Sequence, residues 1–341
     1  MRIDRRTFAG GLAATLATPF SSFAASITDA TGRTVSGADK ITRVYPAGPP
    51  ATVEIYTLAP DLLIGWIEPP TPEAREFLLP DIAARPQIPR LTGRGGVNID
   101  ALKSSPPDII IDIGTVTTEF KTLAEKVQQD SGIPYVLLDG RLDRVGATYR
   151  ALGQLLGRNE DAEKLATAAE STITTVTKRV AAVPSDARPR VYYTRDKSGL
   201  QTGFGGSMIS EPIEFMGARN VAADLHGSHG VATVEQVRGW DPEIIIASDA
   251  DFAASVRTDP AWTGISAIKN GQVYLSPKLP FGWIDYPPAV NRLIGLWWLG
   301  KILYPDRFPE DIKTLARFFY TMFYHVTPTP AQIDRVLGSG V

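Results

Sequence analysis

The chain has 341 residues, of which 43% are hydrophobic and 21% are charged, and its formal net charge at pH 7 is −2. This length is enough for two domains of about 150 residues each. The near-neutral charge and the lack of a basic patch argue against nucleic acid as a partner. Because the sequence contains no cysteine, disulfides, thiolate metal sites and a lipid-bearing cysteine are all excluded.

The first 24 residues have the features of an export signal. Arg5 and Arg6 precede a weakly apolar stretch over residues 9–17, and the small residues Ser22 and Ala24 offer a cleavage site. This pattern predicts a cleavable signal peptide of the twin-arginine type, too short to span a membrane. The alternative is a buried first helix. We expect a soluble, exported protein of the periplasm, acting as a monomer.

Short apolar runs alternate with helical patterns through the rest of the chain. Seven runs predict strands, at residues 42–45, 62–66, 108–113, 135–138, 190–193, 244–247 and 272–275. A helix is expected over residues 51–58. Nearly continuous apolar runs are typical of parallel strands covered on both faces. The sequence therefore predicts an α/β fold with two Rossmann-like lobes, each built on a mostly parallel sheet.

One phrase occurs twice in the sequence. Residues 92–111 read TGRGGVNIDALKSSPPDIII, and residues 227–246 read GSHGVATVEQVRGWDPEIII. At a constant offset of 135 residues, Asp100 matches Glu235, and each acid opens a short helix that leads into an apolar strand. The repeat predicts two similar lobes. Clefts between domains are where small ligands bind.

The longest helical pattern lies between the two copies, over residues 159–183. We interpret it as a rigid connection of roughly 34 Å between an N-terminal lobe (25–158) and a C-terminal lobe (184–341). The alternative is an ordinary helix that covers one lobe. A helical connection permits only small closing motions. From residue 291 onward the pattern is helical and aromatic, as expected of core helices.

Polar and aromatic residues follow the predicted strands. The carboxyl ends of parallel strands are where α/β proteins bind ligands. Ten candidate ligand-binding residues stand at these positions: Trp66, Arg94, Thr115, Arg195, Phe204, Ser207, His229, Ser248, Trp283 and Tyr286. Arg94 matches His229 in the repeat, so these two are expected to face each other across the cleft. Arg94 and Arg195 would attract an anion through paired N–H donors, and Trp66 and Trp283 would supply flat apolar walls.

The signatures of common enzyme classes are missing. The sequence has no cysteine nucleophile, no G-x-S-x-G elbow and no phosphate-binding loop of the Walker type. His226 and His229 are a weak candidate for a metal pair, with solvated loop histidines as the alternative. We therefore expect no catalysis, no metal and no cofactor. An exported α/β enzyme is the rival interpretation from a different class.

Four stretches together resemble a known family: ITDATGRTV, NIDALKSSPPDIII, VATVEQVRGWDPEIII and NGQVYLSPKLPFGWIDYPP. They resemble the periplasmic solute-binding proteins of iron-siderophore and cobalamin ABC importers, and the resemblance covers essentially the whole chain after the signal. The segment GWIDYPPAVNRLIGLWWLGKILYP is most similar to a branch that includes both ferric-siderophore binders and molybdate or tungstate binders.

The resemblance implies a ligand in a shallow cleft and two partners, the small molecule and an inner-membrane ABC permease with its ATPase. The family docks onto its permease through one acid on each lobe, and the matching positions are Asp100 and Glu235. Asp100 departs from the usual glutamate. The implied ligand is an anionic metal complex, first a ferric siderophore, with molybdate or tungstate as the alternative and a corrinoid or haem third.

Overall fold

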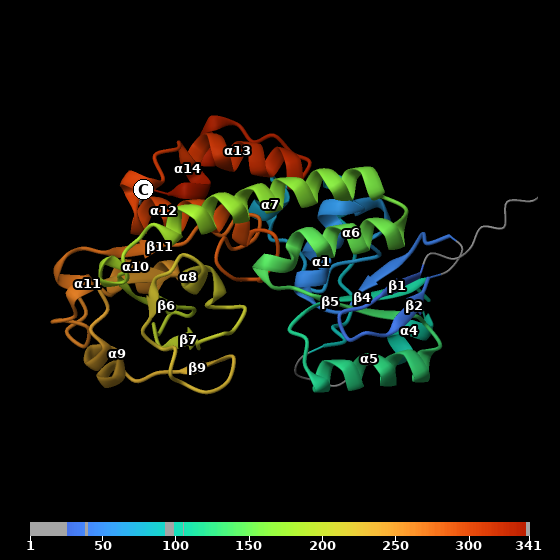
Figure 1. Ribbon diagram of the computed structural model, residues 1–341, viewed down its shortest axis with the longest axis horizontal. Coiled ribbons are helices and arrows are strands. Elements are labelled where there is room, and N and C mark those ends of the chain that lie inside the picture. Colours follow the sequence, from blue (N-terminus) through green and yellow to red (C-terminus); the bar gives the residue numbers. More distant parts are fainter. Residues whose placement is uncertain (1–25, 38–39, 93–98, 105, 339–341) are drawn as a thin grey trace, which may run out of the picture.

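The computed structural model describes residues 26–37, 40–92, 99–104 and 106–338. The predicted signal peptide (1–24) and Arg94 therefore lie outside the described residues. Figure 1 shows two lobes side by side, with the long helix α7 (Asn159–Ala181) running along one side of both. Each lobe has a mostly parallel sheet with helices packed around it. The predicted α/β fold, with two lobes joined by a long helix, is confirmed.

The N-terminal lobe is built on a three-stranded parallel sheet preceded by an antiparallel hairpin. The sheet order is β3 (Val44–Pro46), β4 (Ile109–Gly114) and β5 (Tyr135–Asp139), and the hairpin is β1 (Ser26–Thr28) with β2 (Thr34–Ser36). Along β4, Ile109 and Ile111 pack into one hydrophobic core and Ile110 packs into a second. Successive side chains of a strand point to opposite faces, so this apolar run is buried on both.

The helices of this lobe cover both faces of its sheet. They are α1 (Pro49–Leu58), α2 (Pro72–Arg75), α3 (Pro80–Ala83), α4 (Ile99–Ser104), α5 (Thr118–Ser131) and α6 (Val145–Leu156), with short 3-10 helices at Pro60–Leu62 and Leu142–Arg144. The helix expected at 51–58 is thus present as α1. Residues 62–66, all of them described, do not form the expected strand. Leu63 bridges Val44 whereas Trp66 bridges Gln87, so the segment changes partner before a ladder can form.

The C-terminal lobe has a four-stranded parallel sheet and a two-stranded antiparallel sheet that the sequence did not indicate. The order of the first is β11 (Val273–Leu275), β10 (Ile244–Ala247), β6 (Arg190–Thr194) and β8 (Arg219–Asn220), and the second pairs β7 (Gln201–Gly203) with β9 (His229–Val231). Its helices are α8 (Glu211–Phe215), α9 (Val234–Trp240), α10 (Ala250–Ser255) and α11 (Ser266–Lys269), with a 3-10 helix at Ser185–Ala187. The other predicted strands of both lobes are present, with ends shifted by two residues or fewer.

The two copies of the repeat fold alike. In each, a short helix (α4 or α9) leads into an interior strand of the sheet (β4 or β10). The acid before that strand binds the neighbouring strand in the same way. Asp108 Oδ2 accepts the backbone N–H groups of Thr42 and Arg43 at 2.6 and 2.9 Å, and Glu243 Oε2 accepts that of Arg190 at 2.8 Å.

The chain after the C-terminal sheet returns to the N-terminal lobe. It forms α12 (Arg292–Leu303), a 3-10 helix at Pro305–Arg307, α13 (Ile312–Phe323) and α14 (Pro330–Leu337). The Tyr56 hydroxyl donates to the Tyr324 carbonyl at 2.8 Å, and the Phe77 ring meets the edge of Tyr320. Through these contacts α13, which follows the C-terminal sheet in the chain, packs against the N-terminal lobe.

One fully buried arginine joins the two lobes directly. Arg292 donates to the Gly140 carbonyl of the N-terminal lobe at 2.5 Å and to Glu211 Oε2 of the C-terminal lobe at 2.5 Å. Glu211 Oε1 in turn accepts the backbone N–H of Leu142 at 3.0 Å. The lobes are thus tied by buried, charge-assisted hydrogen bonds as well as by α7. In the described part of the chain, no helix is long and apolar enough to cross a membrane.

Candidate ligand-binding cleft

The carboxyl ends of the parallel strands meet between the lobes, as expected for a ligand site in an α/β fold. Two adjoining cavities lie there, with volumes of about 580 and 620 Å³. We name them the arginine cavity, lined by Arg90 and Arg195, and the glycine cavity, lined by Gly205, Gly206 and Gly227. They share four lining residues: Thr115, Ser207, Met208 and Ser228. Together they form one cleft.

Arg90 is the cation that the N-terminal lobe presents to the arginine cavity. Hydrogen bonds on both sides hold its backbone, from the Tyr45 hydroxyl to the Pro89 carbonyl at 2.6 Å and from the Leu91 N–H to the Ala47 carbonyl at 2.9 Å. Its exposed side chain has no hydrogen bond or ion pair to any described residue. The guanidinium donors of Arg90 are therefore available to an anionic ligand.

A buried acid lies in the same wall. Asp112, on β4, lines the arginine cavity and is only 4% exposed. Burial raises the pKa of its carboxyl to about 6, although the Tyr135 hydroxyl, the Ile113 N–H and the charge of Arg90 act in the opposite direction. The Tyr135 hydroxyl lies 3.0 Å from Asp112 Oδ2. At neutral pH the Asp112 carboxylate is therefore a negative charge near Arg90, and it becomes protonated as the pH falls toward 6.

The C-terminal lobe supplies a cation that already has a partner. Arg195 follows β6, and its Nε donates to Oδ2 of the buried Asp285 at 2.6 Å. The Arg195 guanidinium lies 4.6 Å from the centre of the Tyr286 ring, and the Tyr286 hydroxyl donates to the Arg195 carbonyl at 3.2 Å. Burial lowers the pKa of Arg195, but the Asp285 carboxylate, with Tyr286 and Tyr193, outweighs this and raises it. Arg195 is therefore charged and fixed in place.

The first turn of α1 also faces the arginine cavity. Pro49 and Pro50 line the cavity and occupy the first two helical positions after Gly48. The positive end of the helix dipole favours an anion there. The two prolines, however, lack N–H groups, so α1 acts on an anion through its field more than through hydrogen bonds.

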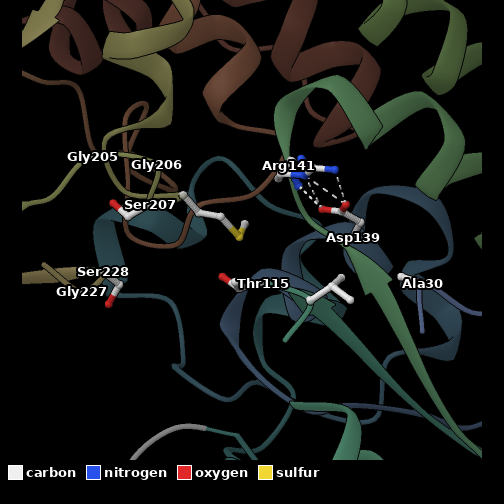
Figure 2. A pocket seen from close by; sticks show the side chains of 11 residues that line it. Ala30, Thr115, Asp139, Arg141, Gly205, Gly206, Ser207, Gly227 and Ser228 are labelled. Atoms are coloured by element: carbon white, nitrogen blue, oxygen red, sulfur yellow. Dashed lines mark hydrogen bonds and ion pairs between the residues drawn. The ribbon is translucent and has the colours of Figure 1, made fainter. Parts of the chain in front are cut away.

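The glycine cavity lies between surfaces of both lobes (Figure 2). On one side Arg141 and Asp139 form an ion pair at 2.9 Å. On the other side are Ser207 and Ser228, with Thr115 between the two groups in Figure 2. This half of the cleft therefore offers hydroxyl groups and one charged pair, beside the apolar side chains of Val116 and Met208.

Five of the ten predicted site residues line the cleft: Thr115, Arg195, Ser207, His229 and Tyr286. Thr115, His229 and Tyr286 are exposed, whereas Arg195 and Ser207 reach the cleft from more enclosed positions. His229 and Ser228 are bonded through Nδ1 and Oγ at 2.9 Å. The expected pairing of His229 with Arg94 falls on a residue that is not described.

Four other predicted residues line neither of these two cavities, although Trp66 lines a smaller cavity beside them. Trp283 is fully buried, with its indole N–H 3.3 Å from the Tyr320 hydroxyl of α13. Trp66 is 1% exposed, and its indole donates to the Ile82 carbonyl at 2.7 Å. Phe204 is buried beneath Gly230. The Ser248 hydroxyl donates to the Arg195 carbonyl at 2.9 Å, and so supports the site from behind.

These differences from the expectation have a common cause. An aromatic ring at the end of a strand is exposed only if nothing else covers it, and here α13 and the loop around Phe281 cover the rings. Conversely, Arg90 and Asp112 line the cleft but were not predicted. Signals for both were in the sequence, because Arg90 stands four residues before Arg94 and Asp112 is an acid within an otherwise apolar strand.

The two acids predicted to dock a permease occupy equivalent places. Asp100 lies in the first turn of α4 and Glu235 in the first turn of α9, and both are exposed. In Figure 1, α4 and α9 lie on the side of their lobes away from α7. Among the residues that the structure describes, no group of three or more His, Cys, Asp or Glu side chains could hold a metal ion.

Comparison with known proteins places this architecture in a family. The family profile described as "Periplasmic binding protein" matches residues 68–279. The molybdate-binding protein MolA of Haemophilus influenzae is 26% identical over 263 residues, which are 70% of this chain and 73% of MolA.

Solved structures share this two-lobed architecture. An ABC transporter solute binding protein from Sulfurospirillum deleyianum superposes with a TM-score of 0.84 at 28% identity, over 92% of this chain and 98% of that chain. The vitamin B12 binding protein BtuF of Vibrio cholerae shares the fold, with a TM-score of 0.60 at 21% identity over 77% of this chain and 96% of that chain. The chain therefore belongs to the periplasmic binding protein family, with the architecture of the substrate-binding component of an ABC transporter.

Proposed function

We propose that this protein captures a tetrahedral metal oxyanion of the molybdate and tungstate class in the periplasm and delivers it to an ABC importer. The observation that carries the proposal is the pair of arginines in one cavity, Arg90 from the N-terminal lobe and Arg195 from the C-terminal lobe. An anion between them would be held by charge-assisted hydrogen bonds from both lobes. The relationship to MolA, which binds molybdate, supports the same class of ligand.

The hydroxyl groups of the lining support a compact polar ligand. Thr115, Ser207 and Ser228 offer hydroxyl groups at the junction of the two cavities. Large organic arms are stabilised by flat apolar walls, and no tryptophan among the described residues lines either cavity of the cleft. This reverses the order expected from the sequence, in which a ferric siderophore came first.

A ferric siderophore is the second candidate, and the size of the cleft favours it. Each cavity, at about 580 and 620 Å³, is larger than a tetrahedral oxyanion requires and falls within the range of sites for drug-sized molecules. The two candidates differ in what they demand of the site. An oxyanion depends on the arginines and hydroxyls, whereas a chelate also depends on apolar surface.

Calorimetric titration of the mature protein with molybdate, tungstate, sulfate and a ferric catecholate siderophore tests the proposal. We expect molybdate and tungstate to bind tightly, and Arg90→Ala to weaken them by about 1.5–3 kcal/mol, roughly tenfold or more. The matched control is Arg238→Ala on α9, where the exposed guanidinium donates to the Pro260 carbonyl and lies outside the described lining of the cleft. Tight binding of the ferric siderophore with no binding of molybdate would replace the first candidate with the second.

A further inference from the structure

A third cavity lies beside the arginine cavity. It has a volume of about 330 Å³, and we name it the tryptophan cavity because Trp66 and Phe281 line it, together with a single lysine, Lys278. Only four residues line both this cavity and the arginine cavity: Pro49, Glu68, Tyr286 and Pro287. These four residues form the partition between the two spaces.

Tyr286 is the large side chain of that partition. It is 40% exposed, and two cations lie near its ring, with Arg195 Cζ at 4.6 Å and Lys278 Nζ at 5.7 Å from the ring centre. Arg195 belongs to the arginine cavity and Lys278 to the tryptophan cavity. Contacts between a cation and an aromatic ring are attractive, so both cations help to hold the ring in place.

The loop that carries Tyr286 is fixed. The Gly282 N–H donates to the Tyr286 carbonyl at 3.0 Å, and the Tyr286 N–H donates to Asp285 Oδ1 at 2.7 Å. The Asn291 amide donates to the Pro287 carbonyl at 2.9 Å. A Cβ at Gly282 would lie 1.9 Å from the Asp285 carbonyl oxygen, so the turn closes only with glycine there. Tyr286 is therefore a fixed wall.

The backbone conformation at Tyr286 is unfavourable for an aromatic residue, which suggests that the ring itself has a role at this position. Its φ is 64°, in the left-handed region that glycine adopts freely and an aromatic residue disfavours. Strain of this kind persists where the surrounding structure holds it, and it concentrates at ligand sites. Glycine would suit the backbone better, but it would leave the two cavities connected.

We infer that Tyr286 keeps a ligand in the arginine cavity from extending into the tryptophan cavity, and so selects against chelates that carry an arm on that side. The inference rests on the proposed function and deepens it. With the ring in place, the arginine cavity takes a compact oxyanion. Without it, the connected space takes a chelate of the same oxyanion that carries an aromatic arm with a carboxylate. Trp66 and Phe281 would pack on such an arm, and Lys278 would bind its charge.

Tyr286→Gly is the test, because it removes the ring and also suits the positive φ. Tyr286→Phe is the matched control, since it keeps the ring and loses only the hydroxyl. Each protein is titrated calorimetrically with molybdate and with the molybdate complex of 2,3-dihydroxybenzoate. We expect the ratio of the two affinities to move toward the complex by about tenfold in Tyr286→Gly and to change little in Tyr286→Phe. Adding Lys278→Ala to Tyr286→Gly should remove most of the gain.

The outcomes separate this inference from the proposed function. If the wild-type protein does not bind molybdate, the proposed function is wrong. The role of Tyr286 is then judged from the affinities of the wild type and Tyr286→Gly for the 2,3-dihydroxybenzoate complex alone. A folded Tyr286→Gly protein that binds the complex no better than Tyr286→Phe overturns the inference. A gain that survives Lys278→Ala overturns the placement of the arm in the tryptophan cavity.

Discussion

β4 and β10 occupy interior positions in their sheets, and each follows a short helix whose first turn carries an acid. The ends of the two strands nevertheless differ. After β4 the chain exposes Thr115, which lines both cavities of the cleft. After β10 it buries Ser248, which donates to the Arg195 carbonyl and lines neither cavity. The scaffold of the repeat is therefore kept, whereas the residues that directly follow the two strands differ in exposure.

The difference arises from what covers each strand end. In the C-terminal lobe the Ser248 hydroxyl bonds the Arg195 carbonyl, and the cleft surface comes from Arg195 after β6, from Ser207, and from Ser228 and His229 at the start of the second repeat copy. In the N-terminal lobe the strand end itself faces the cleft. The two strand ends thus carry different functions, because a ligand surface depends on which segments lie outermost rather than on the strand order.

The largest expected effect concerns the acids in the first turns of α4 and α9, which the two copies of the repeat share. Reversing both helix-start acids, Asp100→Lys with Glu235→Lys, should abolish uptake of the native ligand in cells while leaving ligand affinity in solution nearly unchanged. The physical reason is that both acids are exposed, on the side away from α7, and lie outside the cleft. The matched control reverses Glu160 and Asp161, two acids in the first turn of α7. Normal uptake by the first double variant would contradict the docking assignment.

The next effect concerns the buried arginine that joins the two lobes. Arg292→Met should lower the free energy of unfolding by about 3–5 kcal/mol, because it leaves the Glu211 carboxylate and the Gly140 carbonyl without their buried partner. Denaturant unfolding measures the loss. Arg179→Met is the control, since the Arg179–Glu310 pair is more exposed and is expected to contribute about 1 kcal/mol or less. Equal losses in the two variants would show that Arg292 is not a tie between the lobes.

A smaller effect separates the two strand ends directly. Ser248→Ala should cost about 0.5–1.5 kcal/mol of stability through its lost hydrogen bond to the Arg195 carbonyl. Thr115→Val removes an exposed hydroxyl from the cleft and should weaken ligand binding while leaving stability nearly unchanged. Thermal unfolding and calorimetric titration of both variants distinguish the two roles. If Thr115→Val loses stability and retains full affinity, the contrast between the strand ends is wrong.

The smallest effect is a pH dependence at Asp108. Partial burial raises the pKa of this carboxyl, but hydrogen bonds from Thr42 and Arg43 outweigh it and hold the pKa below its ordinary value of 3.8. A lowered folded-state pKa contributes stability above pH 3.8 that is lost as the pH falls through the folded-state value. Asp108→Asn should therefore be less stable than the wild type at pH 7, and the gap should narrow below pH 3.8. A gap of equal size at pH 7 and pH 3 would contradict this.

Much of the scaffold could be read from the sequence because it depends on local patterns. The run DIIIDI predicted β4, the matching run predicted β10, and the pattern over 159–183 predicted α7. The site was harder to predict. Thr115 and Arg195 line the cleft, whereas the side chains of Trp66 and Trp283 are buried, because exposure depends on the segments that pack over a strand end.

The sequence by itself determined the family resemblance, the two-lobed α/β architecture and the equivalence of the two acidic helices, since apolar periodicity and repeated motifs act over a few residues. Only the tertiary structure decided which cations face the ligand and which rings are covered. Arg90 and Arg195 are 105 positions apart in the chain and line the same cavity, and α13 covers Trp283 from the far end of the chain. Such contacts depend on how distant segments pack, because a buried ring and an exposed ring can have the same local sequence and differ only in what lies above them.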